Sequence, residues 1–184
     1  MMNWRRFSRT KIAIGVLALG LLIAVPVVGA ESVTQSVEGG DRSASVSGVD
    51  LGSIGYSHEQ QTSGGSISIL VDDSTGSNAG WNVTLQASDF TDGNRVIGAG
   101  NFAIVGAGTP THIAGQEISA EFGPKVPWNG GTGSLDTARK ILSASEGYGK
   151  GTYGQELDVE LTVPGQTLAG TYGANLTVNI TAGP

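Results

Sequence analysis

Few residues in this sequence have the type and spacing that catalysis requires. The chain has no cysteine and only two histidines, His58 and His112, each in a segment rich in polar, Gly or Pro residues. A Ser/His hydrolase would have to recruit one of them, and the Gly-x-Ser-x-Gly turn that exposes a catalytic serine does not occur. The glycines at 149–154 match the dinucleotide pattern Gly-x-Gly-x-x-Gly, but that pattern must open a helix and residues 155–163 alternate like a strand. We therefore predict no enzyme and no bound dinucleotide.

The aspartates offer a different chemistry, oxygen ligands for a hard cation. Asp72 and Asp73 share one predicted turn, and Asp89 and Asp92 lie in another. Carboxylates at these intervals could hold Ca²⁺ weakly, although the full loop spacing of a known calcium motif is absent. Asp, Asn and Gly are also the residues that tight turns require. The expectation is therefore no cofactor, with weak Ca²⁺ binding at these four aspartates as the alternative.

One aromatic residue lies where it could bind a ligand. Trp128 and Asn129 belong to residues 123–131 (GPKVPWNGG), which the Pro and Gly content predicts to be a loop. An exposed indole can stack on the apolar face of a sugar while a neighbouring amide bonds its hydroxyls. The alternative is that the indole packs against the protein as a plug. Trp128 and Asn129 are the candidate ligand contacts.

Strands, rather than helices, must position these side chains. Apolar and polar residues alternate with a period of two in residues 81–85, 157–163 and 172–180, which is typical of strands with one buried and one wet face. Trp81 faces the predicted core in this pattern. Shorter candidate strands are separated by turn residues, and only residues 137–145 resemble a short helix. The predicted fold is all-β, an antiparallel β-sandwich or barrel-like sandwich. The shorter candidates are residues 43–49, 66–71, 95–97, 102–105 and 116–122.

The first thirty residues predict a secretory signal peptide. Four basic residues precede an uncharged apolar run at 12–28, and Val28-Gly29-Ala30 provides small residues for cleavage after position 30. As a helix, that run would span about 25 Å, short of the ~30 Å hydrocarbon core, although retention as a membrane helix is the alternative. We expect residues 1–30 to be the signal peptide and residues 31–184 a single exported β domain. Membrane contact is expected only during export.

The net charge of residues 31–184 limits the kinds of partner that the exported domain can bind. With six basic and sixteen acidic residues, residues 31–184 have a formal charge of −10. An acidic surface of this kind repels polyanions, so we predict no nucleic-acid partner. Basic partners or cations would be attracted instead. No LPxTG sequence for covalent wall attachment occurs, so retention at a surface is expected to come from non-covalent binding.

Two segments of the predicted domain form a recognisable pair. The sequence GWNVTL lies at 80–85, and AGTY lies at 169–172, ahead of a closing strand. In this order they resemble the two signature blocks of the WxL domain, a cell-surface domain of Gram-positive bacteria. The resemblance covers about residues 48–183.

The resemblance implies a function and a set of motif residues. Trp81 and Leu85 match the first block, and Tyr172, Val178 and Ile180 match the second. Val178 and Ile180 stand where family members usually have a second Trp-x-Leu, so the second indole is replaced here. The implied role is a non-catalytic, secreted protein of the cell surface that binds peptidoglycan or another cell-wall polymer non-covalently. Sister surface proteins are implied as further partners.

Two alternatives remain open. The chain could be a structural or adhesive surface subunit that assembles with partner surface proteins through exposed strands. It could also be a hydrolase whose site is not recognisable in the sequence. Neither alternative has a diagnostic residue pattern.

The loop tryptophan gives the first testable prediction. Trp128→Ala should leave the melting temperature nearly unchanged and weaken sedimentation of the protein with purified peptidoglycan sacculi, because a displayed indole contributes contact and little packing. A large drop in melting temperature with unchanged sedimentation would favour the plug.

Overall fold

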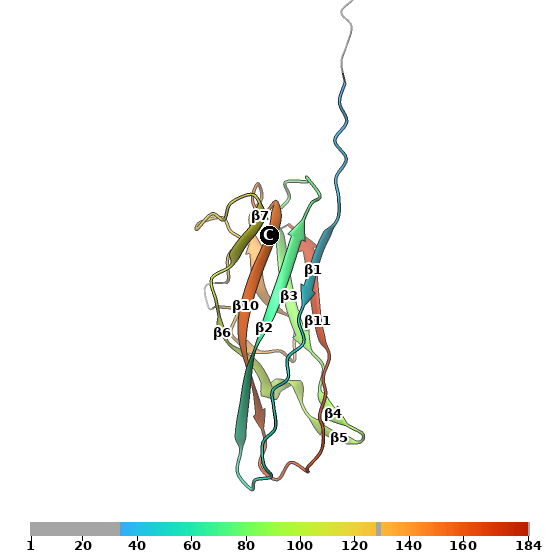
Figure 1. Ribbon diagram of the computed structural model, residues 1–184, viewed down its shortest axis with the longest axis vertical. Coiled ribbons are helices and arrows are strands. Elements are labelled where there is room, and N and C mark those ends of the chain that lie inside the picture. Colours follow the sequence, from blue (N-terminus) through green and yellow to red (C-terminus); the bar gives the residue numbers. More distant parts are fainter. Residues whose placement is uncertain (1–33, 128–129, 184) are drawn as a thin grey trace, which may run out of the picture. The chain divides into compact units, whose positions relative to one another are not determined.

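Figure 1 shows the protein as a computed structural model that describes residues 34–127 and 130–183. The predicted signal peptide at 1–30 lies outside the described residues, so it stays a prediction. Residues 37–184 form one compact unit, and all the strands belong to it. In the described part of the chain, no helix is long and apolar enough to cross a membrane.

The larger sheet is built on two long neighbouring strands. β2 (Gln61–Asp73) and β10 (Gly151–Val163) pair antiparallel along all thirteen residues of each. Alternate side chains at residues 67–73 of β2 and 153–161 of β10, among them Ile67 and Leu157, are buried. Shorter strands flank this pair, with β1 beside β2, β6 and β7 beside β10, and β8 beside β6. Their bounds are β1 (Arg42–Val46), β6 (Phe102–Ala107), β7 (Thr111–Gly115) and β8 (Gly133–Ser134).

The smaller sheet has β3 (Trp81–Ala87) at its centre, between β11 (Leu176–Ala182) and β9 (Arg139–Ala144). A separate hairpin, β4 (Phe90–Asp92) and β5 (Arg95–Ile97), follows β3. It is followed by a single turn of 3₁₀ helix, η1 (Ala99–Asn101). The buried faces of the two larger sheets form a common hydrophobic core, and their edge strands β1 and β11 lie next to each other (Figure 1). The predicted all-β antiparallel sandwich is confirmed.

Four local predictions differ from the structure. Asp72 and Asp73, predicted to lie in a turn, are the last two residues of strand β2. Residues 139–144, within the predicted short helix, form strand β9. Its pairing with β3 shifts register between Val83 and Thr84, so Ile141 and Leu142 are both buried and break the two-residue alternation. Residues 116–122 form turns with one isolated bridge rather than a strand. The predicted strand at 172–180 begins only at Leu176, which leaves residues 172–175 in a loop.

Trp81 is the largest fully buried side chain of the core. Its indole Nε1 donates a hydrogen bond to the Gly149 carbonyl at 2.9 Å, and its ring lies 6.2 Å from that of Tyr153. Gly149 has φ +79°, and a Cβ there would lie 2.6 Å from the indole nitrogen. The glycine-rich approach to β10 therefore gives the indole both its space and its hydrogen-bond acceptor. The first glycine of the dinucleotide-like pattern therefore serves the packing of Trp81, and the pattern is followed by strand β10 rather than by a helix.

Removing the indole should destabilise the protein strongly. Trp81→Ala is expected to cost ~3–5 kcal/mol of unfolding free energy, because burial is lost and a cavity remains. Denaturant unfolding measures this cost, with Val105→Ala as a matched control, since Val105 is 53% exposed. A cost below about 1 kcal/mol would contradict the core role of Trp81.

Candidate functional site

Four of the five predicted motif residues, all except Tyr172, lie on neighbouring strands of the smaller sheet. β3 and β11 are antiparallel neighbours, and Val178 lies opposite Leu85 while Ile180 lies opposite Val83. Leu85 is fully buried, and the two β11 side chains are half-buried against the core. In this chain the paired motif strands therefore build the core, and their apolar side chains face inward. Tyr172 is separate, because it lies before β11 in a loop.

A pocket lies at the end of the sandwich where β2 and β10 extend past the last residue of β1 and the first residue of β11. β2 and β10 have thirteen residues each, whereas β1 has five and β11 seven, so the long strands extend past their neighbours. Two irregular segments cover this extension, the β1–β2 loop (residues 47–60) and the β10–β11 loop (residues 164–175). Between them is a pocket of about 700 Å³. This volume falls within the range of about 300–1,000 Å³ typical of small-ligand sites.

Backbone contacts hold the two loops in place. The Gln166 amide donates to the Ser57 carbonyl at 2.8 Å, which joins the tips of the loops. Thr91 of β4 and Gly173 exchange two backbone hydrogen bonds of 2.9 and 3.1 Å. Arg95 donates from its guanidinium to the Ala169 carbonyl. Because the loops are bonded to each other and to the β4–β5 hairpin, the pocket is formed without a ligand.

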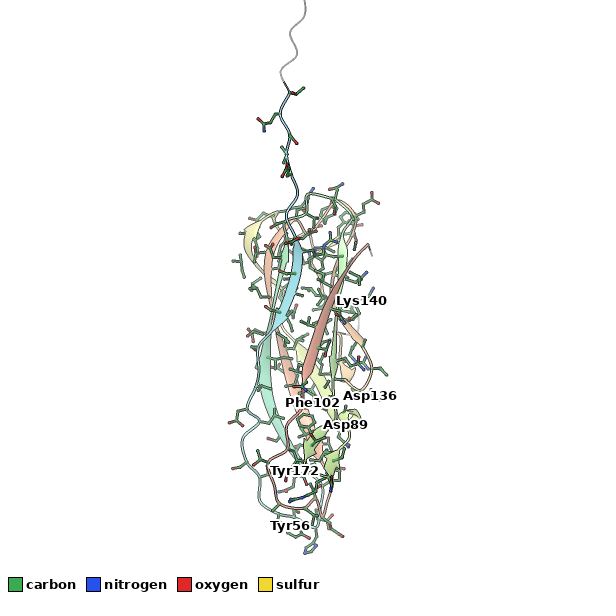
Figure 2. The ribbon with its side chains drawn as sticks, turned by 90° about the vertical axis from the view of Figure 1, so that its right-hand side faces the viewer. Tyr56, Asp89, Phe102, Asp136, Lys140 and Tyr172 are labelled. Atoms are coloured by element: carbon green, nitrogen blue, oxygen red, sulfur yellow. The ribbon has the colours of Figure 1, made fainter. Side chains whose placement is uncertain are left out.

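The floor and the rim of the pocket differ in character. The floor is made of buried core side chains, including Phe102 and Leu161. At the rim, Tyr56 is 59% exposed and Leu168 is 62% exposed, and the Tyr172 hydroxyl donates to the Leu168 carbonyl at 2.8 Å. Figure 2 shows Tyr56 and Tyr172 toward the same end of the ribbon, below Phe102. A hollow with an apolar floor, an exposed phenol ring at Tyr56 and a half-buried one at Tyr172 suits a ligand that has both apolar and hydroxyl surfaces.

Charge is scarce in this pocket. Among the described lining residues, Asp50 is the single charged one. Its carboxylate accepts a hydrogen bond from the Gly52 amide at 2.8 Å, in a turn where Gly52 has φ +76°. Neither lysine nor arginine lines the pocket in the part of the chain that the structure describes. The lining therefore provides no counter-charge for an anion.

The four aspartates proposed for Ca²⁺ all have donors nearby. Asp72 accepts hydrogen bonds from the hydroxyls of Ser74 and Thr152, each at 2.7 Å. Asp89 accepts from the Ala99 amide at 2.7 Å, and Asp92 lies 3.2 Å from Arg95. Within residues 34–127 and 130–183, no group of three or more acidic or histidine side chains is arranged to hold a metal ion. Weak Ca²⁺ binding stays a prediction.

Asp73 has the most strongly bonded of these carboxylates. It is buried at the end of β2 and forms a 2.9 Å ion pair with Arg42 of β1. Burial alone would raise its pKa, but hydrogen bonds from Thr75 and Arg42 and the charge of Arg42 outweigh burial and hold the pKa below the ordinary value of 3.8. The pair therefore joins the edge strand β1 to β2. At the neighbouring Tyr153, burial and the charges of Asp73 and Glu117 raise the pKa to about 12.

Comparison with known proteins decides the family. A family model described as the WxL domain, surface cell wall-binding, matches residues 41–184. The chain belongs to the WxL family. Its members are cell-surface, cell-wall-binding domains and are not a known enzyme family, so this WxL protein is a cell-wall-binding protein of the cell surface. No curated protein and no solved structure matched the chain.

The pocket of this WxL protein combines expected and unexpected residues. Tyr172 was expected from the second signature block and lies in the lining. Trp128 and Asn129 lie outside the described residues. Sequence reasoning missed the β1–β2 loop, with Ile54 and Tyr56 at its rim. The available signal was a run of large apolar residues among glycines and serines without strand alternation, at residues 48–57.

The Asp73–Arg42 pair predicts the acid sensitivity of the domain. Because the folded pKa of Asp73 lies below its unfolded value, the stabilisation is present above that value and is lost as pH falls through the folded pKa. Asp73→Asn should lower the denaturant midpoint near neutral pH, and its difference from wild type should shrink between about pH 5 and pH 2. Asp158→Asn, an exposed change on β10, serves as control. A pH-independent difference would contradict the ionic role of Asp73.

Proposed function

We propose that this WxL protein is a non-catalytic surface protein that attaches non-covalently to peptidoglycan through the pocket between the β1–β2 loop and the β10–β11 loop. The observation that supports the proposal is the pocket itself, a hollow of about 700 Å³ with Tyr56 and Leu168 exposed at its rim. Exposed apolar side chains grouped at a hollow are typical of binding sites.

The burial of the motif supports a contact through the loops. Trp81 and Leu85 are both fully buried, so a polymer could reach them only if the sandwich opened. Such opening would expose a large part of the core, which is incompatible with a stable anchor. The motif therefore acts by fixing the strands that carry the loops. On this account, the replacement of the second motif Trp by Val178 alters packing and leaves the binding surface in place.

Sedimentation with sacculi tests the proposal. The purified exported protein should sediment with peptidoglycan sacculi freed of other wall polymers, and Tyr56→Ala with Leu168→Ala should reduce the bound fraction at least several-fold. Ile113→Ala is the matched control, since Ile113 is 57% exposed on β7 and does not line the pocket. Far-ultraviolet spectra and melting temperatures should be unchanged, because both rim side chains are exposed.

Two results would contradict the proposal. Wild-type protein that stays wholly in the supernatant, while a known wall-binding protein sediments, would remove peptidoglycan as the ligand. Undiminished sedimentation of the Tyr56→Ala, Leu168→Ala variant would move the contact away from the pocket.

A second candidate function is assembly with sister surface proteins through exposed strands. The observation that favours it is β11, an edge strand that, within the described residues, pairs by backbone hydrogen bonds with β3 alone and lies next to the edge strand β1 of the other sheet. Its outward side chains, Thr177 and Asn179, are polar and exposed, so a partner strand would be recruited mainly by backbone hydrogen bonds. Light scattering that shows a monomer from micromolar to millimolar concentration, together with no capture of surface proteins encoded alongside, would count against it.

A further inference from the structure

The residues that line the pocket indicate which chemical class of wall component it can bind. We infer that the pocket binds a neutral acetamido sugar unit of the glycan strand, rather than an anionic wall polymer or the carboxylates of stem peptides. This inference rests on the proposed function, because it takes the pocket to be the wall contact. It adds the ligand class, which neither the family nor the motif specifies.

Charge is the first reason for a neutral ligand. An anion that enters a partly apolar pocket loses hydration, and this loss must be offset by a cation or by several hydrogen-bond donors. The described lining contains no lysine, arginine or histidine, and its one charged group is the carboxylate of Asp50. The exported chain is itself acidic, at −10, so its long-range field also repels polyanions. Phosphate-containing polymers and free carboxylates are therefore disfavoured at this pocket.

Aromatic surface is the second reason, and it favours a sugar ring. Tyr56 projects from the β1–β2 loop with 59% of its surface exposed, and its ring makes an edge-to-face contact with the His58 ring at 5.3 Å between centroids. That contact restrains the phenol, so less rotational freedom is lost on binding. A hexose ring has one apolar face of C–H groups that can stack on a phenol, while its hydroxyls stay in water or reach the rim.

Unpaired backbone groups are the third reason, and they favour an acetamido substituent. In the described part of the chain, the amides of Ser53, Ile54 and Gly55 have no protein hydrogen-bond partner. All three residues line the pocket, in a loop next to Tyr56. An acetamido group has a carbonyl that accepts from such amides and a methyl group that fits against an apolar floor. Here that floor is formed by Phe90, Phe102 and other core side chains.

Titration with soluble sugars tests the inference directly. The probe is the neutral trimer of N-acetylglucosamine, added to the isotope-labelled exported protein and followed by amide chemical shifts. We expect shifts concentrated at residues 50–57 and 167–173, at a millimolar or lower dissociation constant. Tyr56→Ala should weaken binding at least tenfold, whereas Tyr56→Phe, which keeps the ring, should bind within about threefold of wild type. Ile113→Ala is the control outside the pocket and should bind as wild type does.

Matched probes separate the chemical classes. The glucose trimer, which is also neutral but lacks the acetamido groups, should bind at least tenfold more weakly. A glycerol-phosphate polymer and a soluble stem peptide should give no shifts in the pocket residues. Equal or tighter binding of any of these three probes would overturn the inference of a neutral acetamido ligand.

The failure of this inference can be told from the failure of the proposed function. Sedimentation with sacculi that depends on Tyr56, combined with no response to the acetylated trimer, would overturn the ligand class and leave the pocket as the wall contact. No sedimentation with sacculi would overturn the proposed function itself. Trimer binding that is identical in wild type and Tyr56→Ala would overturn the placement of the sugar in this pocket.

Discussion

The burial of Trp81 between the two sheets is the constraint on which the rest of the structure depends. The indole is fully enclosed, and its N–H must find an acceptor, which is the Gly149 carbonyl. This one contact fixes the first residue of β3, the central strand of the smaller sheet, against the start of β10 in the larger one. It also explains the glycine at 149, since a Cβ there would lie 2.4 Å from that of Ala144. The signature tryptophan thus determines how the sheets are aligned.

The lengths of the paired strands in turn create the pocket between the two loops. Because β2 and β10 are longer than β1 and β11, they extend past them, and the two loops, together with Phe90, Ile97 and Phe102, surround the space that remains. The β10–β11 loop is bonded to β4, so it cannot collapse onto the β1–β2 loop and fill the space. Under the proposed function two tasks are separate: the buried residues of β3 and β11 stabilise the fold, and the loop rim contacts the wall polymer. A chain can therefore belong to the family without the second motif Trp, provided that Val178 keeps the packing.

Much of the fold could be predicted from local patterns, and the exceptions have physical causes. The alternation at 157–163 predicted the second half of β10, and the alternation at 81–85 predicted the inward side of Trp81, because period two is a local property of a strand. The strand β9 was missed because its register shift places two buried residues, Ile141 and Leu142, in succession. The pocket was missed because it arises from unequal strand lengths in two sheets, a relation that no short window contains. Tyr172 was found through the family resemblance, whereas the only signal for Tyr56 was the run of large apolar residues among glycines and serines at 48–57, which does not indicate a pocket.

Hydrogen exchange of the exported protein, with and without soluble glycan-strand fragments of peptidoglycan, tests the central claim most directly. The account predicts new protection in the β1–β2 loop and the β10–β11 loop, with unchanged exchange in β3 and β11, because the motif strands stay buried throughout. Protection that appears in β3 or β11 while both loops exchange as before would contradict it.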